Sequence, residues 1–361
     1  MKYGIITHYD VHNHGAILQM NALVKVLEQR FGITANMLQY TKNYDFLGSE
    51  KRYKYEFSIN SIRHYINYLY LRGIRLFLFN IRKKIIFERF KKEEKLIGEY
   101  YSKCKDLDGI IIGSDEVFAL HTGPTPALFG YALPSDNVFS YAGSFGPTKL
   151  ADINSLHCTE FVKGGLAELK GLGMRDLNAI NIAETLSGKK ATLNVDPVIL
   201  YGYEQELSLF RPVEKKYVLV YAYEKRMNDK EEYQHIIDFA RQKGLKVVCP
   251  GFYHKWADKN VNVNPIELLR WFKYAEYVIT DTFHGAVISL ITGRELAVKI
   301  RDNANKLRYL LSEYQLENRI IDNEWNLSEI FSSKLDTSRI KEEISLRRKE
   351  SMEYLKSMIE Q

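Results

Sequence analysis

The chain has 361 residues, of which 45% are hydrophobic and 27% charged, and its formal net charge is +6. This size and composition are typical of a globular protein with two domains, and no apolar run of about 18 residues predicts a transmembrane helix. The three cysteines are widely spaced, which excludes a disulfide framework and a zinc motif, and the N-terminus lacks the apolar core of a signal peptide.

The first half of the chain predicts strands that alternate with helices. Residues 3–7 (YGIIT) and 34–40 (TANMLQY) are expected to be strands, and the helix between them is expected to stop near Gly32. Further strands are predicted within residues 108–118, 137–146, 168–176 and 192–200.

A basic segment interrupts this pattern. Residues 51–95 contain 13 Lys and Arg against 4 Asp and Glu, a local balance of +9, and apolar residues alternate with the basic ones at roughly helical spacing. We expect a basic helical insertion over residues 51–100. It is either a set of surface helices with a solvated basic face or a helix that also rests on an anionic membrane. Nucleic acid is not expected, because no nucleic-acid motif accompanies the charge.

The alternation restarts after about residue 210. Strands are predicted at residues 215–223, 245–250, 275–281 and 295–300, with helices at 229–244, 264–275, 284–293 and about 336–360. This predicts an α/β protein with two doubly wound, Rossmann-like domains, residues 1–208 and 209–335, followed by a C-terminal helix over 336–361.

Polar residues gather where the predicted strands end, which is where doubly wound folds bind ligands. The sites are the loops that hold His12, Asn13, His14 and Gly15, then Ser114, Asp115 and Glu116, then Ser144, then Arg175 and Asp176, and finally Asp281, Thr282, Phe283, His284 and Gly285. Single members have simpler explanations: Asp115 and Asp281 as helix caps, Asn13 as a turn residue and His284 as an ordinary histidine at a helix start.

These stretches carry a resemblance. In order along the chain, GIITHYDVHNHGAILQMNAL, DGIIIGSDEVF, SYAGSFG, GMRD, DPVIL and AEYVITDTFHGAVISLITG resemble the motifs of the polysaccharide pyruvyl transferase family. The resemblance implies two domains arranged as in GT-B glycosyltransferases. It also implies transfer of the enolpyruvyl unit of phosphoenolpyruvate to two hydroxyls of a sugar in a capsule, exopolysaccharide or cell-wall polymer, with release of phosphate.

The implied donor site centres on His284, as proton donor or phosphate contact, because histidine titrates near neutral pH. Asp281 is expected to orient His284 or to act as a base, and Thr282 to offer a hydroxyl to phosphate. Arg175 matches the family's arginine and is expected to hold phosphoenolpyruvate, unless it forms a salt bridge with Asp176 or another nearby acid. Lys306 is a further candidate for the same anion.

The acceptor is expected on the N-terminal domain, by analogy with GT-B proteins. Asn13, His14, Asp115, Glu116 and Ser144 would face the sugar, and Asp115 or Glu116 would take the proton of the attacking hydroxyl. The sequence departs from the family at Thr282, where one branch has arginine, at Glu116, where glutamine is common, and over residues 121–136.

Two other functions remain open: a nucleotide-sugar glycosyltransferase of GT-B type, and a non-catalytic scaffold of a polysaccharide assembly complex. Asp106-Leu107-Asp108 spells the DxD of metal-dependent glycosyltransferases, but it precedes a strand and is interpreted as surface. We expect no metal and no cofactor besides phosphoenolpyruvate as co-substrate. The expected location is the cytoplasm, with a lipid-linked acceptor and peripheral membrane contact through the basic segment, in which Lys83, Lys84, Lys91 and Lys92 would face the lipid.

Overall fold

The computed structural model describes residues 1–43, 58–59, 61–63, 73–214, 216–301 and 305–360. Within these residues the first half of the chain forms a seven-stranded parallel sheet in the order β3-β2-β1-β4-β5-β6-β7. Its strands are β1 (Lys2–Ile6), β2 (Thr34–Gln39), β3 (Ile97–Tyr100), β4 (Gly109–Ile112), β5 (Val138–Gly143), β6 (Leu172–Met174) and β7 (Ala191–Leu193).

The second half forms a six-stranded parallel sheet, in the order β10-β9-β8-β11-β12-β13 over the described residues. Its strands are β8 (Tyr217–Tyr221), β9 (Lys246–Pro250), β10 (Lys259–Val261), β11 (Tyr277–Thr280), β12 (Leu296–Lys299) and β13 (Ile320–Ile321). Strands β8 and β11 are apolar and almost fully buried, as expected for a parallel sheet covered on both faces.

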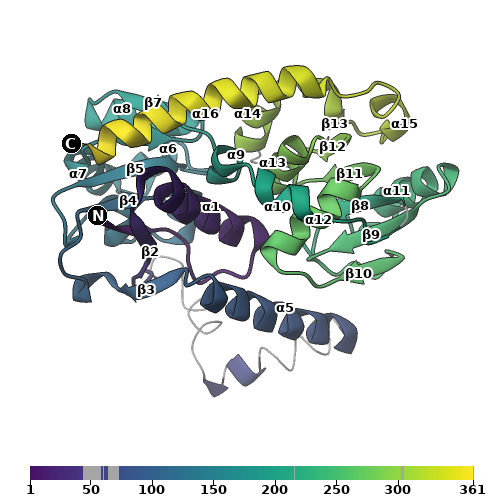
Figure 1. Ribbon diagram of the computed structural model, residues 1–361, viewed down its shortest axis with the longest axis horizontal. Helices are drawn as coiled ribbons and strands as arrows, with labels where there is room; N and C mark the ends of the chain where they lie inside the picture. The colour runs from purple at the N-terminus through teal and green to yellow at the C-terminus, as the bar shows by residue number, and fades with distance from the viewer. Residues whose placement is uncertain (44–57, 60, 64–72, 215, 302–304, 361) are drawn as a thin grey trace.

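Helices connect the strands and cover both faces of the two sheets (Figure 1). Those of the first half are α1 (His14–Phe31), α5 (Ile74–Glu93), α6 (Leu150–Ser155), α7 (Thr159–Glu168), α8 (Leu177–Ser187), α9 (Pro197–Tyr201) and α10 (Glu204–Leu209). Those of the second half are α11 (Lys230–Gln242), α12 (Pro265–Tyr274), α13 (Phe283–Thr292), α14 (Asn305–Glu313), α15 (Leu327–Ile330) and α16 (Thr337–Ile359).

Both sheets are doubly wound. In each, the strand order reverses beside the first strand, between β1 and β4 in one sheet and between β8 and β11 in the other. The crevice at such a reversal, beyond the carboxyl ends of the strands, is where this class of fold binds ligands. The predicted fold class is therefore confirmed, and the two reversals define where the site must be sought.

The predicted basic insertion differs from the structure at its end. Residues 74–93 form helix α5, but Ile97–Tyr100 form β3, the edge strand of the first sheet. The sequence IGEY is short and only half-buried, so it lacks the apolar run that marks a central strand. Residues 51–57, 60 and 64–72 of the predicted insertion lie outside the described residues.

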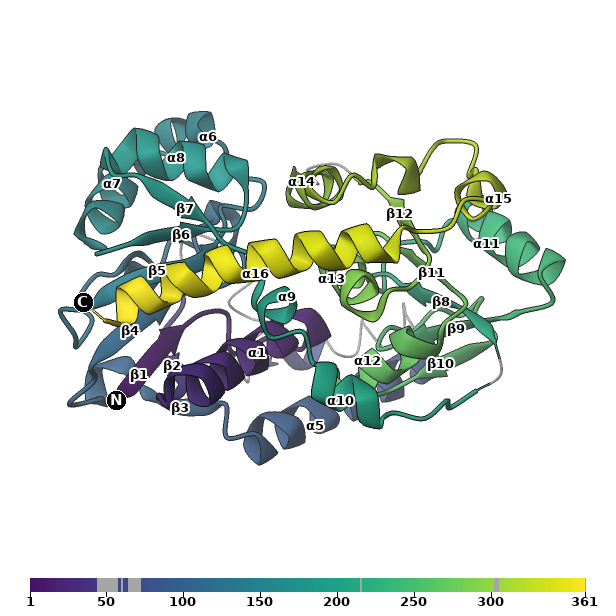
Figure 2. The same ribbon diagram turned by 45° about the horizontal axis from the view of Figure 1, so that its top comes forward.

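Two sets of contacts hold the halves together. Helix α1 packs on α9 and α12, and α9 packs on α13. Helix α16 begins beside the second sheet and runs back across the first, so that the C-terminus lies near β4 and α7 (Figure 2). There the Tyr354 hydroxyl donates to the Ser140 carbonyl at 2.8 Å, and the Ser351 hydroxyl accepts from the Val195 amide at 3.0 Å. Among the described residues, no helix has the length and apolarity that crossing a bilayer requires.

Candidate active site

A cavity of about 340 Å³ lies where the carboxyl ends of the two sheets face each other. Both halves of the chain contribute to it, from the loops that follow β4, β5, β8, β11 and β12 and from the start of α14. Its lining consists of Glu116, His121, Pro147, Tyr223, Arg226, Asp281, Thr282, Phe283, His284, Arg301, Lys306 and Leu307. The lining is rich in charged groups, which suits a small polar ligand.

The stretch Thr280–Gly285 is a tight connection from β11 to α13. Thr282 is the N-cap of α13, since its hydroxyl accepts a hydrogen bond from the Gly285 amide at 2.9 Å. The Thr280 hydroxyl fixes the turn by donating to the Tyr221 carbonyl at 2.5 Å. The predicted phosphate contact of Thr282 would therefore have to be made by a hydroxyl that already caps a helix.

His284 is held in place by close packing. A Cβ atom added to Gly15 would lie 2.2–2.6 Å from atoms of the His284 side chain, so only glycine fits at residue 15. On its other side, His284 Nε2 lies 3.6 Å from Asp196 Oδ2. The imidazole is thus confined between the start of α1 and a buried carboxylate, and it is 7% exposed.

Asp196 and Arg175 form the support behind His284. Arg175 donates from Nη1 to Asp196 Oδ2 at 3.0 Å and from Nη2 to Asp115 Oδ1 at 3.1 Å, and its guanidinium lies 4.5 Å from the Phe283 ring centre. Burial raises the pKa of the Asp196 carboxyl, but its contacts with His284, Arg175 and the Val198 amide lower it below the ordinary value. Asp196 is therefore an anion beside the histidine.

The predicted salt bridge of Arg175 with a nearby acid is what the structure shows, although the partners are Asp115 and Asp196. Asp176 instead caps α8 through the Ala179 amide at 2.9 Å. The Arg175 side chain is 2% exposed, and each of its terminal nitrogens donates to one of the two carboxylates. Its Nε is buried without a hydrogen-bond partner, so the guanidinium retains donor capacity.

Lys306 links the two halves of the chain across the cavity. Its ammonium lies 2.7 Å from Glu116 Oε1 and 3.8 Å from Asp115 Oδ1. Burial acts to raise the pKa of Glu116, but Lys306 and His121 lower this pKa to about 2. Burial likewise opposes the charge of Asp115, and Lys306 and Arg175 hold its pKa far below the ordinary value. Asp115 and Glu116 are therefore carboxylates, and both lie close to the Lys306 ammonium.

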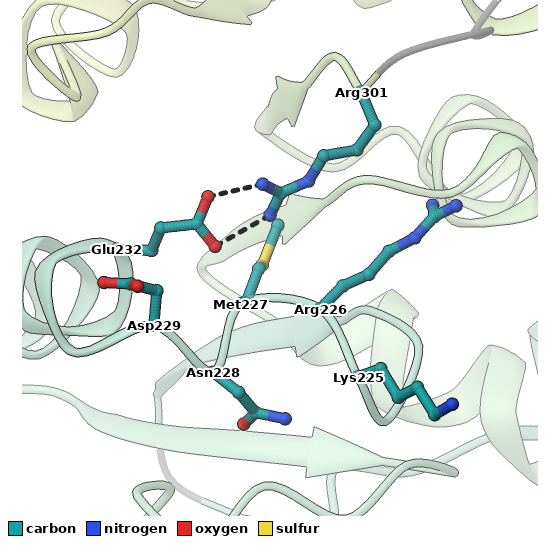
Figure 3. A pocket seen from close by; sticks show the side chains of 7 residues that line it. All are labelled: Lys225, Arg226, Met227, Asn228, Asp229, Glu232 and Arg301. Carbon is teal, nitrogen blue, oxygen red and sulfur yellow. Dashed lines mark hydrogen bonds and ion pairs between the residues drawn. The ribbon is translucent and has the colours of Figure 1, made fainter.

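Asp281 does not orient His284, contrary to one of its predicted roles. Its carboxylate accepts from Arg301 Nε at 3.1 Å and lies 3.9 Å from Arg226 Nη1. Burial raises the pKa of Asp281 to about 6, although both arginines act against this shift. Arg301 also meets both carboxylate oxygens of Glu232, and Arg226 projects nearby from the loop after β8 (Figure 3).

Three of the predicted acceptor residues make structural contacts and are not part of the cavity lining. Asn13 is the N-cap of α1, and its amide also donates to the Tyr223 hydroxyl at 3.1 Å. His14 is fully buried between the halves, with Nε2 at 2.9 Å from the Val263 carbonyl, so it does not face the cavity. Ser144 is also fully buried and donates to Asp176 at 2.6 Å. Of the predicted acceptor residues, Glu116 lines the cavity and Asp115 lies directly behind it.

The sequence analysis missed Asp196, Arg226 and Arg301. Asp196 lies in DPVIL after β7, where Asp before Pro is also the ordinary start of a short helix, and it does cap α9 through the Val198 amide. Arg226 and Arg301 follow β8 and β12, so the same rule about strand ends would have selected them had it been applied to every strand.

A profile of the family described as polysaccharide pyruvyl transferase matches residues 13–303. The chain belongs to the polysaccharide pyruvyl transferase family. The matched region contains every strand of the two described sheets except β1 and β13, and it includes His284, Arg175 and Asp196. The family is one of transferases for the pyruvylation of polysaccharides, which implies a sugar or polysaccharide acceptor and a pyruvyl donor. No curated protein is a significant match to the chain by sequence.

Solved structures with the same architecture include sugar-modifying enzymes. A UDP-N-acetylglucosamine 2-epimerase is 11% identical, covers 97% of this chain and 93% of that chain, and has a TM-score of 0.51. UDP-GlcNAc 2-epimerase from Methanocaldococcus jannaschii is 13% identical, covers 94% of this chain and 94% of that chain, and has a TM-score of 0.48. E. coli heptosyltransferase WaaC with ADP is 12% identical, covers 85% of this chain and 89% of that chain, and has a TM-score of 0.40. At these identities the likeness concerns the fold alone, and the first of them agrees with the GT-B-like architecture that we expected.

In the described part of the chain, no group of three or more His, Cys, Asp or Glu side chains is placed to hold a metal ion. The charged groups of the cavity instead pair with one another, carboxylate to cation.

Proposed function

We propose that this transferase moves the enolpyruvyl unit of phosphoenolpyruvate onto two hydroxyls of a sugar, in a bacterial surface polysaccharide or its lipid-linked precursor, and releases phosphate. The observation that supports this most is the composition of the cavity. His284 stands at the start of α13, with Lys306, Arg226 and Arg301 around the same small space. A histidine among three cations suits a small polyanion that must be protonated.

The donor would lie against the second sheet. Phosphoenolpyruvate carries a phosphate and a carboxylate, and each needs a cationic partner in a partly buried site. Arg226 has a side chain that is 40% exposed, and the rim contacts of Lys306 are with Glu116 and Asp115, which a phosphate can replace. The start of α13, a helix of ten residues, adds a favourable field for an anion.

His284 is proposed as the general acid that gives its proton to the methylene carbon of the donor, with Asp196 as the residue that positions it. The adjacent carbon then gains positive character, and a sugar hydroxyl adds to it and loses its proton to Asp115 or Glu116. A second sugar hydroxyl next forms a bond to the same carbon as the carbon–oxygen bond to phosphate breaks, and its proton leaves with the phosphate. The product is a cyclic ketal.

The acceptor is proposed to be lipid-linked, which would bring the protein to the cytoplasmic face of the membrane. Glu116 is the acidic residue at the rim on the side of the first sheet. Its position fits a contact with the incoming sugar, and its carboxylate would be released when phosphate engages Lys306.

Calorimetric titration tests the donor. We expect saturable binding of phosphoenolpyruvate, weaker by about tenfold in Lys306→Met because one charge-assisted contact is lost. Lys216→Met is the control, since that lysine is exposed and pairs with Glu276 outside the cavity. Arg175→Ala is a poorer probe, because it leaves buried Asp115 and Asp196 without their partner.

The same titration with UDP-sugars and CMP-sugars addresses the glycosyltransferase alternative. Binding of a nucleotide sugar in place of phosphoenolpyruvate would refute the proposal. Equal affinity of wild type and Lys306→Met for phosphoenolpyruvate would show that the anion binds elsewhere.

A further inference from the structure

Helix α5 carries an apolar stripe on its outer face. The exposed fractions of its side chains are 55% for Ile74, 47% for Leu78, 40% for Ile81 and 62% for Ile85. At 3.6 residues per turn, these four positions fall within about 60° of one another around the helix axis. Large apolar side chains rarely line up at the surface of a globular protein unless something covers them.

The opposite face of the same helix is anchored in the protein. Phe79, Phe87 and Phe90 are buried there, about 180° from the outer stripe. The Phe79 carbonyl accepts from the Asn262 amide at 2.9 Å, and Lys83 lies 3.9 Å from the centre of the Phe252 ring. These contacts with the second half of the chain hold α5 at the periphery of the molecule (Figure 1). The exposed stripe lies on the side of the helix opposite to these contacts.

Basic side chains flank the stripe. All of those on the outer half of the helix are exposed, namely Arg75, Arg82, Lys84, Arg89 and Lys92. The acids on this surface already have partners: Glu88 lies 2.7 Å from Lys91 and 2.9 Å from His12, and Glu93 lies 2.7 Å from Arg89. An outer apolar stripe between basic residues is typical of helices that lie in the interface of an anionic bilayer.

We propose that α5 docks this protein on an anionic phospholipid surface, with Ile74, Leu78, Ile81 and Ile85 entering the interface. The structure corrects the prediction of which lysines face the lipid. Lys83 and Lys91 are buried on the inner face, whereas Lys84 and Lys92 are exposed. The apolar residues are therefore the anchor, and the basic residues provide attraction to lipid phosphate. The evidence for docking comes from the residues of α5 alone. Docking would bring the protein close to the lipid-linked acceptor of the proposed function.

A second copy of the chain is the competing occupant of an exposed apolar stripe. The basic flank argues against it, because an isologous contact through this face would bring the arginines of one copy near those of the other. A phospholipid surface with phosphatidylglycerol has the opposite charge and matches both the stripe and its flank.

Co-sedimentation with vesicles tests the docking. We expect the full chain to bind vesicles of phosphatidylcholine and phosphatidylglycerol more tightly than vesicles of phosphatidylcholine alone. Ile81→Glu/Ile85→Glu should weaken this binding by about tenfold or more, because two anchoring side chains become charged. Leu346→Glu is the matched control, since Leu346 is 51% exposed on a different helix, α16, and should bind as the wild type does.

Equal vesicle binding by wild type and Ile81→Glu/Ile85→Glu would overturn the proposal, as would an absence of binding by the wild type. A dimer in light scattering that the double variant abolishes would assign the stripe to a second copy instead. Phosphoenolpyruvate titration of the double variant should match wild type, which separates a failure of the docking from a failure of the proposed reaction.

Discussion

The two sheet edges that face each other across the cavity have opposite charge. The first half contributes Asp115, Glu116 and Asp196, with Arg175 locked between two of them. The second half contributes Lys306, Arg226, Arg301 and His284, with Asp281 placed among the arginines. Arg175 on the acidic edge and Asp281 on the cationic edge have the opposite sign to their neighbours, and both are buried.

This difference shows how one site can serve an anionic donor and a neutral acceptor. The cationic edge suits phosphate and carboxylate, whereas the carboxylates of the acidic edge suit hydroxyl groups that must lose protons. Lys306 of the cationic edge pairs with Glu116 and lies near Asp115 of the acidic edge. Donor binding must therefore compete with Glu116. The variants below test this division of roles between the cationic edge and the acidic edge.

The largest effect is expected at the cationic edge with His284→Asn. Loss of the only proposed general acid should lower phosphate release from phosphoenolpyruvate and acceptor by about 10²–10⁴-fold. Gly15→Ala should also reduce turnover strongly while keeping the imidazole, because the added methyl group collides with it. His235→Asn, which alters a histidine stacked on Trp325 outside the cavity, is the control. Turnover within a few-fold of wild type in His284→Asn would show that His284 is not the general acid, and an absence of turnover in the wild type would favour a scaffold.

The next effect concerns Asp281, the acid of the cationic edge, and the pH dependence of stability. Because its pKa is raised to about 6 in the folded protein, the folded state binds its proton more readily than the unfolded state does. Its protonation therefore stabilises the fold as the pH falls from about 7 towards 4. Relative to Asp281→Asn, the wild type should gain on the order of 2 kcal/mol in free energy of unfolding over this range.

Chemical denaturation at several pH values measures this gain. Asp136→Asn, a change at an exposed carboxyl far from the cavity, should follow the wild type at every pH. The raised pKa would be contradicted if the free energy of unfolding of wild type, relative to that of Asp281→Asn, stayed constant or decreased as the pH falls.

The smallest effect is expected at the acidic edge with Glu116→Gln. Removing this charge frees Lys306 for the donor, so phosphoenolpyruvate should bind several-fold more tightly than to wild type. The change conserves the shape of the side chain. Calorimetry measures it, and weaker donor binding in Glu116→Gln would mean that Glu116 supports the donor rather than competing with it.

Much of the fold was predictable because it depends on local patterns. The apolar runs of β4, β8 and β11 are long enough to mark buried parallel strands, and Gly32 and Gly293 mark helix ends in the left-handed conformation. Short edge strands such as β3 and β13 carry little of this pattern, since an edge is packed on one side only. Their place in a sheet depends on neighbours far away in the chain.

The location of the site was predictable from the sequence, but the roles of its side chains were not. The rule about strand ends placed Glu116, Asp281 and His284 on one cavity from loops distant in sequence. Whether a polar side chain caps a helix or faces a ligand depends on geometry: Thr282 and Asn13 are the caps, whereas Asp115 and Asp281 are not. Partnerships across the halves, such as Asp196 with His284, depend on how the two sheets meet, which no local pattern specifies.

Helix α16 has a mechanical consequence. The chain crosses from the first half to the second through α9 and α10 and returns through α16, so the two halves are tied at two places. Two crossings of the chain restrict the relative motion of the halves more than one crossing would. The two halves therefore cannot be obtained as separate fragments by cutting a single linker.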